Sequence, residues 1–288
     1  MRTRVKFFFG LLCLASTYAL AAGGALQAPA RIEAGNPFSI ATTGSGKAVL
    51  YIVGPQQVLR REIQLGDNVS FEHGDLHNAG LYLVVLAGSG ANETAQLEVT
   101  ADHQAAKLSF LANPSRAPVD QRDGISGVVY VFDTFHNLIL QPTPVEFRIS
   151  GAAGTETRNQ STRNGVAWVR MNSAPQSGAA QFIAAAGSVT EKRVIQQVPG
   201  DPCHLRMTAQ SSGPHIILQT EPVRDCSGNA VPDGTVVTFT ETYNGKQSTV
   251  DVPLKRDVAK TELPAHEGAV ISVATGVVMG NEIRLGEK

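Results

Sequence analysis

One segment of the chain occurs twice at a fixed spacing of ninety-two residues. Residues 133–167 (DTFHNLILQPTPVEF … GVA) return as residues 225–259 (DCSGNAVPDGTVVTF … DVA), and the spacings match without a gap. Both copies consist of short β-forming runs separated by turn residues. A period near ninety residues corresponds to one antiparallel β-sandwich of immunoglobulin (Ig) size. The repeat therefore predicts tandem β-sandwiches, and no segment shows the helical period that a phosphate-binding βα unit would need.

The charge of the chain argues against two classes of partner. Its 288 residues include 24 Lys and Arg against 25 Asp and Glu, which gives a formal net charge of −1. A chain this close to neutrality produces no strong electrostatic field. Nucleic acid is therefore not expected as a partner, and neither is an anionic membrane surface.

The N-terminus has the pattern of a secretory signal peptide. Basic residues at positions 2, 4 and 6 precede an apolar run over residues 7–20, and Ala19-Leu20-Ala21 supplies a small-x-small cleavage pattern. The apolar run is shorter than the roughly 20 residues that a membrane span requires. We therefore predict a signal peptide over residues 1–21. No other stretch could span a bilayer, so no stable membrane insertion of the mature chain is expected.

Cleavage of the signal would leave two cysteines, Cys203 and Cys226, and a pair of cysteines in an exported chain suggests one disulfide. Strand-like runs at 205–209 and 216–220 flank a turn at 211–214. In an antiparallel hairpin about that turn, the two cysteines lie nearly opposite each other. Such a bridge would contribute on the order of 3 kcal/mol. The alternatives, free thiols or a metal pair, lack further Cys or suitably spaced His.

Turn residues and short linkers divide the mature chain into three expected Ig-like sandwiches, over residues 22–100, 101–199 and 200–288. In the first, strand-like runs recur about every ten residues. These runs are 38–40, 48–53, 69–71, 81–86 and 95–99. The linker around Pro199-Gly200-Asp201-Pro202 is rich in proline and is expected to be stiff.

A local motif sharpens the prediction for the first sandwich. The run Asn78-Ala79-Gly80-Leu81-Tyr82 resembles the tyrosine corner of Ig-like domains, in which a Tyr hydroxyl bonds back to the preceding turn. Val84 and Ile40 stand where an antibody domain would carry its two cysteines. We therefore expect an aliphatic core in place of that disulfide. The alternative is a buried Tyr that makes no corner bond.

The repeated pattern reads D-x-x-x-N, then V-x-F, then G-V-A. In the first copy the matching positions are Asp133, Asn137, Val145, Phe147, Gly165, Val166 and Ala167, and in the second they are Asp225, Gly228, Asn229, Val237, Phe239, Val258 and Ala259. The pattern resembles the bacterial Ig-like domains of the invasin/intimin type. The resemblance implies a β-sandwich of an exported or surface protein that often serves as a stalk in adhesion. Because Asp257 replaces the expected glycine, the turn is predicted to differ there.

No group of residues forms a recognisable catalytic site. A nucleophile needs a base and an orienting group, yet no Gly-x-Ser-x-Gly elbow occurs and the carboxylates are scattered. We therefore predict a protein that is not an enzyme, with no cofactor and no metal. His73 and His77 are assigned to a surface loop rather than to zinc. The repeated Asp and Asn residues could be calcium ligands, but they are assigned to turns because their side chains bond nearby backbone.

The single tryptophan is the candidate binding residue. Trp168 lies in the strand-like run VAWVRM, and if Ala167 and Val169 face the core then Trp168 and Arg170 point outward. An exposed Trp would be a binding or interdomain anchor. The commoner alternative is that Trp168 packs beneath a neighbouring loop.

These observations favour a non-enzymatic, exported Ig-like repeat protein that acts as a structural spacer or as an adhesion or binding element of a bacterial cell envelope. The alternative is a carbohydrate- or protein-binding accessory module that uses Trp168 and Arg170. A weaker alternative is a secreted hydrolase with an unrecognised site. The expected partner is a protein or glycan at the envelope, and the location is periplasmic, cell-surface or secreted.

Overall fold

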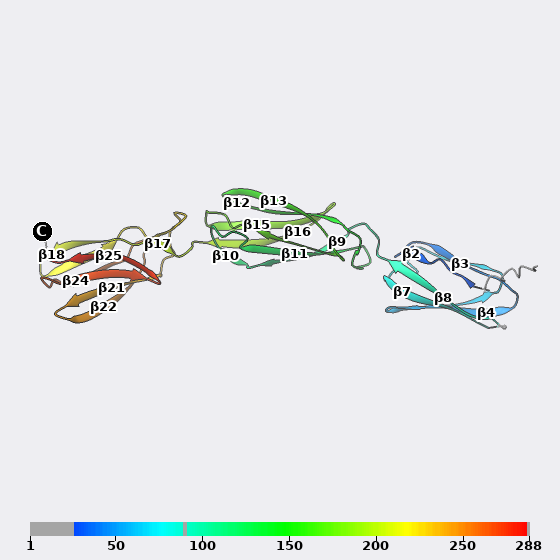
Figure 1. The fold of residues 1–288 in the computed structure, drawn as a ribbon. Helices are drawn as coiled ribbons and strands as arrows, with labels where there is room; N and C mark the ends of the chain where they lie inside the picture. Colours follow the sequence, from blue (N-terminus) through cyan, green and yellow to red (C-terminus); the bar gives the residue numbers. More distant parts are fainter. Residues whose placement is uncertain (1–25, 89–90, 287–288) are drawn as a thin grey trace, which may run out of the picture. The chain divides into compact units, whose positions relative to one another are not determined.

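The computed structural model describes residues 26–88 and 91–286, so the predicted signal peptide lies outside the described residues. These residues form the expected all-β structure, and they contain no helix (Figure 1). Across the described chain, no helix has the length and apolar character needed to cross a membrane. The structure divides into two compact units, one ending at Thr100 and the other starting at Ala101.

The first unit is a sandwich of two sheets. Its five-stranded sheet has the order β2 (Arg31–Glu33), β8 (Ala91–Thr100), β7 (Gly80–Gly88), β4 (Lys47–Gly54) and β5 (Gln57–Gln64). Its three-stranded sheet has the order β1 (Leu26–Gln27), β3 (Phe38–Thr42) and β6 (Asn68–Phe71). Side chains alternate between buried and exposed along most strands, because one face of each sheet covers the core.

The tyrosine corner of the first unit is confirmed. Tyr82 is fully buried, and its hydroxyl donates a 2.8 Å hydrogen bond to the backbone oxygen of Asn78. Ile40 and Val84 are also fully buried, as expected for the aliphatic core. Gly54 lies against the Tyr82 ring so closely that a Cβ atom there would overlap the ring. The corner therefore depends on the ring and the hydroxyl of Tyr82 and on the absence of a side chain at Gly54.

The second unit begins with a second sandwich, built from β9 to β16. Its five-stranded sheet has the order β10 (Arg116–Pro118), β16 (Val189–Val198), β15 (Gly178–Ala186), β12 (Pro144–Gly151) and β13 (Gly154–Ser161). Its three-stranded sheet has the order β14 (Val166–Met171), β11 (Ile125–Phe132) and β9 (Lys107–Asn113). Between the sheets, Phe110, Phe147 and Phe182 pack with ring centroids 5.0–6.3 Å apart.

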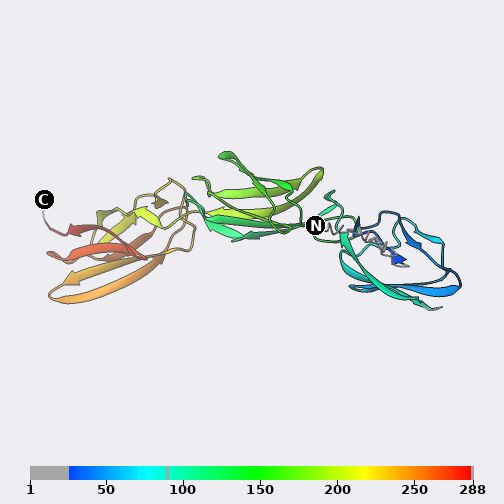
Figure 2. The same cartoon turned by 45° about the vertical axis from the view of Figure 1, so that its right-hand side comes forward.

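The same unit ends with a third sandwich, built from β17 to β25 (Figures 1 and 2). Its four-stranded sheet has the order β22 (Lys246–Pro253), β21 (Val236–Tyr243), β24 (Val270–Thr275) and β25 (Val278–Arg284). A second sheet has the order β18 (Met207–Ser212), β19 (His215–Thr220) and β23 (Lys260–Pro264), and a short ladder joins β17 (Pro202–His204) to β20 (Arg224–Asp225). The second and third sandwiches have separate hydrophobic cores. Because both belong to one compact unit, the expected boundary after Pro199 stays a prediction.

The ninety-two-residue repeat is present in the hydrogen bonds of the structure as well as in the sequence. Val131 N donates to Gly165 O at 3.1 Å, and Val223 N donates to Asp257 O at 2.8 Å, ninety-two residues later. Phe147 and Phe239 occupy equivalent, fully buried positions in the two cores. The conserved spacing therefore reports equivalent sites in two sandwiches.

The sequence predicted that the turn at Asp257 would differ from the equivalent turn at Gly165, and this prediction is wrong. The turn that contains Asp257 closes with Lys255 N bonded to Val258 O at 2.9 Å, just as Arg163 N bonds to Val166 O at 2.8 Å in the other copy. Asp257 adopts a φ of 66°, in the left-handed region that Gly165 occupies with a φ of 80°. Aspartate tolerates this region better than most residues do, so the turn is retained without the glycine.

We predict that Tyr82→Phe destabilises the first unit. Loss of the hydroxyl leaves the Asn78 carbonyl without its donor, which should cost about 1 kcal/mol of the free energy of unfolding. Differential scanning calorimetry should show one unfolding transition shifted to lower temperature. Tyr130→Phe is the matched control, because the half-buried Tyr130 makes no side-chain hydrogen bond within the described residues. Equal effects of the two substitutions would contradict the role of the corner.

Candidate functional site

Each copy of the repeat begins with a buried aspartate that organises a tight turn. The Asp133 Oδ1 atom accepts backbone hydrogen bonds from Phe135 N at 2.9 Å and Asn137 N at 2.8 Å. The Asp225 Oδ1 atom accepts equivalent bonds from Ser227 N at 2.9 Å and Asn229 N at 2.8 Å. These contacts define Asx-type turns. The assignment of both aspartates to turns is therefore confirmed.

The second oxygen of each aspartate binds the chain that leads into the sandwich. Asp133 Oδ2 accepts a hydrogen bond of 3.1 Å from Asp102 N, and Asp225 Oδ2 accepts one of 2.9 Å from Gly200 N. The asparagine four residues later supports the same carboxylate, through Asn137 Nδ2 in one copy and Asn229 Nδ2 in the other. We call each arrangement a linker clamp. It explains why both Asp and Asn recur in the pattern.

The electrostatics of the second linker clamp favour an ionised aspartate. Burial of the Asp225 carboxyl group raises its pKa, but backbone hydrogen bonds from Gly200, Asn229 and Ser227, together with the Asn229 side-chain amide, outweigh burial. The pKa of Asp225 is therefore lowered from its usual value. Hydrogen bonds that favour the charged form have this effect in general.

The predicted disulfide is present and is attached to the same turn. Cys203 on β17 is bonded to Cys226, with the Cα atoms 4.8 Å apart. The bridge joins cysteines separated by 23 positions, and a loop of this size gives about 3 kcal/mol of stabilisation in the chain-entropy model. Its neighbour Asp225 pairs with Pro202 in the β17–β20 ladder. A covalent bond and a carboxylate thus hold the same short linker.

The turn of the third sandwich also reaches the second sandwich. The Asn229 side chain donates a 2.7 Å hydrogen bond from Nδ2 to Pro175 O, and its Oδ1 atom accepts one of 2.8 Å from Ser177 N. Ser227 adds a 3.3 Å bond from its hydroxyl to the Asp120 carboxylate. Sequence reasoning gave Asn229 a turn role only, and it missed this bridge.

The loop that Asn229 contacts is itself held in place. Ser173 N donates to Gln121 O at 2.9 Å, and Asp120 N donates to Ala174 O at 3.0 Å. Ala174 N also donates to the side chain of Gln197, which is buried. Asn229 therefore binds a loop whose backbone is fixed within the second sandwich.

Trp168 lies on the outer face of the three-stranded sheet in the second sandwich. Ala167 and Val169 are buried, and 65% of Trp168 is exposed, so the alternative of a Trp packed beneath a loop is wrong. Arg170 is exposed on the same face. Trp168 lies opposite Val128, which lies opposite Leu111, and Leu111 is also largely exposed. Their role as binding contacts stays a prediction.

A groove runs beside Trp168 at the edge of the sandwich. The side chains that line it include Asp123, Arg158, Gln160, Arg163, Trp168 and Arg170. Arg158 is paired with Glu156 at 2.8 Å and with Asp123 at 3.5 Å. Among the described residues, neither Arg163 nor Arg170 has a carboxylate partner. The groove, which we call the Trp168 groove, therefore presents unneutralised positive charge.

An equivalent groove occurs in the third sandwich. Its lining includes Lys255, Arg256, Val258 and Lys260. Lys255 corresponds to Arg163 and Lys260 to Trp168, each ninety-two residues later. The position and the positive character are thus repeated, whereas the tryptophan is specific to the second sandwich.

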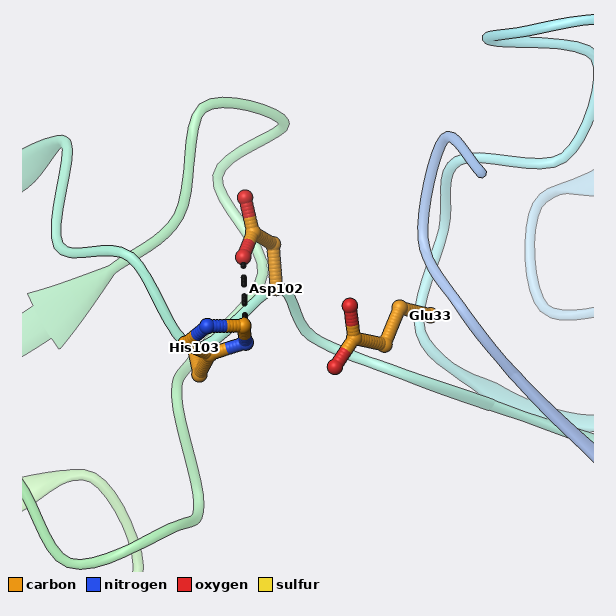
Figure 3. Close-up of side chains that lie close together, drawn as sticks. All are labelled: Glu33, Asp102 and His103. Carbon is orange, nitrogen blue, oxygen red and sulfur yellow. Dashed lines mark ion pairs between the residues drawn. The ribbon is translucent and has the colours of Figure 1, made fainter. Parts of the chain in front are cut away.

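The histidines provide no comparable constellation. His73 and His77 lie in the loop between β6 and β7, as expected, and Nδ1 of His77 lies 3.1 Å from the backbone oxygen of Gly74. Asp102 and His103 form an ion pair of 3.5 Å at the start of the second unit (Figure 3), and the third side chain drawn there, Glu33, belongs to the first unit. Two ligands from adjacent residues are fewer than metal sites in proteins use, so this pair carries no argument for a metal.

The lowered pKa of Asp225 makes a prediction about pH. An ionised Asp225 should stabilise the fold above its unfolded pKa of about 3.9, and this contribution should be lost as the pH falls through the lower folded value. Asp225→Asn should therefore be less stable than the parent near neutral pH, with a difference that shrinks on acidification. Thermal unfolding measured from about pH 7 to about pH 2 checks this. Asp201→Asn, at an exposed linker position, is the control and should follow the parent throughout.

Comparisons with known proteins identify solved structures with a similar fold. The sequence matches no protein-family model and no curated protein. The structure is similar to that of the Escherichia coli adhesin FdeC, with 13% identity and a TM-score of 0.60 over 92% of this chain and 98% of that one. It is also similar to Yersinia pseudotuberculosis InvD, with 15% identity and a TM-score of 0.54 over 91% and 97%. The chain therefore has the Ig-like β-sandwich fold of these bacterial proteins, and the predicted resemblance to invasin/intimin-type domains is confirmed at the level of the fold.

Proposed function

We propose that this chain is a non-enzymatic, exported repeat protein that serves as a structural spacer or adhesion element of a bacterial cell envelope. The observation that carries the proposal is the Asn229 bridge, which joins a turn of the third sandwich to a fixed loop of the second. A spacer must hold each sandwich in a fixed orientation relative to the next one. A bridge, a linker clamp and a disulfide at one junction suit that task.

Export is supported by the disulfide and by the signal pattern. Disulfides persist in oxidising compartments, such as the periplasm and the cell surface, and are rare in the cytosol. The adhesin named above shares the fold and suggests an envelope role by analogy. A weaker alternative, a secreted hydrolase, would be revived by turnover of a polymer by the pure protein.

A second candidate function is a carbohydrate- or protein-binding accessory module. The exposure of Trp168 favours it, because tryptophan is among the residues most enriched at binding hot spots. The neighbouring Arg170 could orient a polar or anionic group beside the ring. This function is compatible with a spacer, since a spacer can also carry a binding surface.

The spacer proposal predicts that Asn229→Ala loosens the junction. Removal of the amide deletes both hydrogen bonds to the loop, so the second and third sandwiches should reorient more freely. NMR relaxation of the backbone amides should give rotational correlation times that differ more between the two sandwiches than in the parent. The control is Asn159→Ala, at an exposed position on β13. If the second and third sandwiches of the parent already tumble independently, the spacer mechanism is wrong.

The binding proposal predicts that Trp168→Ala weakens attachment to a surface ligand. Truncation of an aromatic anchor commonly costs about 2 kcal/mol or more of binding free energy, equivalent to roughly a thirtyfold loss of affinity. Arrays of glycans and of envelope proteins, probed with the parent and the variant, measure the effect. Leu81→Ala, an exposed apolar residue of the first unit, is the control. Binding of undiminished affinity in the Trp168 variant would rule this surface out.

A further inference from the structure

We propose that the Trp168 groove binds an extended acidic peptide segment, which adds to β14 as a further β-strand. This inference rests on the second of the two functions above, in which Trp168 marks a binding surface. It goes further by naming the chemical class of the partner and the way in which it is held. Three features of the groove carry it: a free strand edge, a missing strand and unneutralised arginines.

The first feature is the free backbone of β14, which is the edge strand of its sheet. Val131 N bonds to Gly165 O, and bonding partners alternate along an antiparallel ladder, so the residues that bond to β11 are the odd-numbered ones. The N–H and C=O groups of Trp168 and Arg170 therefore point away from β11. Edge groups of this kind are the template on which extended peptides add to a sheet.

The second feature is the unequal size of the two sheets. The sheet that contains β13 has five strands, whereas the sheet that contains β14 has three. Arg158 and Gln160 on β13 lie opposite Phe147 and Val145, which are buried, so their side chains belong to the core-facing side of the sheet. They line the groove beside β14. A strand added to β14 would lie beneath them and complete the smaller sheet.

The third feature is charge. Arg163 and Arg170 line the groove without a carboxylate partner among the described residues, and Asp123 is already engaged by Arg158. Arginine recognises carboxylates with two parallel hydrogen bonds. Side chains of an added strand alternate between the face that carries Trp168 and Arg170 and the face that covers Arg158. A peptide with acidic residues at alternate positions therefore presents all of them on one face, where they can pair with the unneutralised Arg170.

The repeat supports the same site independently. In the third sandwich, β23 is also an edge strand, and Lys255, Arg256 and Lys260 line the groove beside it. Basic groups thus recur at equivalent edges although their identities differ. A saccharide could also stack on Trp168 and pair with Arg170, but it would leave the backbone groups of β14 unused. The free strand edge is what favours a peptide over a saccharide.

The test uses the full chain and a labelled peptide of about eight residues in which Thr and Asp alternate, a length typical of one strand. Binding is followed by the anisotropy of the label and by the fluorescence of Trp168, which is the only tryptophan of the chain and so reports on this groove. We expect saturable binding that weakens as salt rises. We also expect a shift of the Trp168 emission, and no binding of the peptide in which Lys replaces Asp.

Two comparisons decide the mechanism. Arg170→Gln should weaken binding about tenfold because a charge-assisted contact is lost, whereas Arg148→Gln, on an exposed face of β12, should leave binding unchanged. A peptide of the same charge with every backbone amide N-methylated should not bind, because it cannot donate to the β14 edge. Circular dichroism verifies that both variants fold.

Several outcomes would overturn the proposal. They are the absence of binding, an affinity that is the same in Arg170→Gln and the parent, and undiminished binding of the N-methylated peptide. An acidic oligosaccharide such as oligogalacturonate, tested in parallel, distinguishes failure of the acidic-strand mechanism from failure of the binding function of Trp168. If it shifts the Trp168 emission and the peptide does not, the acidic-strand mechanism is wrong while the binding function of Trp168 stands.

Discussion

The hydrogen bonds to a buried aspartate carboxylate are the interaction on which the linkers within the second unit depend. One oxygen of Asp133 or Asp225 closes a turn, and the other holds the chain that leads into the sandwich. A buried carboxylate is unfavourable unless its lone pairs are satisfied, and here backbone donors satisfy them. The same group therefore fixes a local turn and a long-range contact. Without it, the linker, the Asn229 bridge and the disulfide would have no common anchor.

The two sandwiches of the second unit show how one framework supports different tasks. The hydrogen bonds around Val131 and Val223 are equivalent, as are the cores around Phe147 and Phe239. Core positions diverge as well, as where the buried Ile139 is replaced by the buried Val231, but two divergent positions lie on the surface or at the junction. At one of them, Trp168 is replaced by Lys260, and at another, Thr134 is replaced by the disulfide residue Cys226. Divergence at such positions changes contacts while leaving the packing unaltered.

Much of the fold could be predicted because its signals are local or periodic. The repeat, the tyrosine corner at Tyr82 and the pairing of Cys203 with Cys226 all follow from spacing. The polar edge strand β5 (Gln57–Gln64) was missed, since its exposed flank weakens the hydrophobic alternation. The Trp168 groove and the Asn229 bridge could not be predicted, because they join segments whose proximity is decided by tertiary packing. The exposure of Trp168 ran against the usual preference of large aromatic residues for the interior.

The chemistry of the linker clamp has an evolutionary consequence. Asp225 receives the backbone N–H of Gly200, and Asn229 contacts the backbone of Pro175 and Ser177. These bonds go to backbone atoms, and only the 3.3 Å bond from Ser227 to the Asp120 carboxylate depends on a side chain of the preceding sandwich. A duplicated or exchanged sandwich would therefore keep most of this junction wherever the preceding sandwich presents a loop in the same place. Because most of these contacts are made to backbone atoms, an array of sandwiches can lengthen by recombination with few compensating substitutions at each junction.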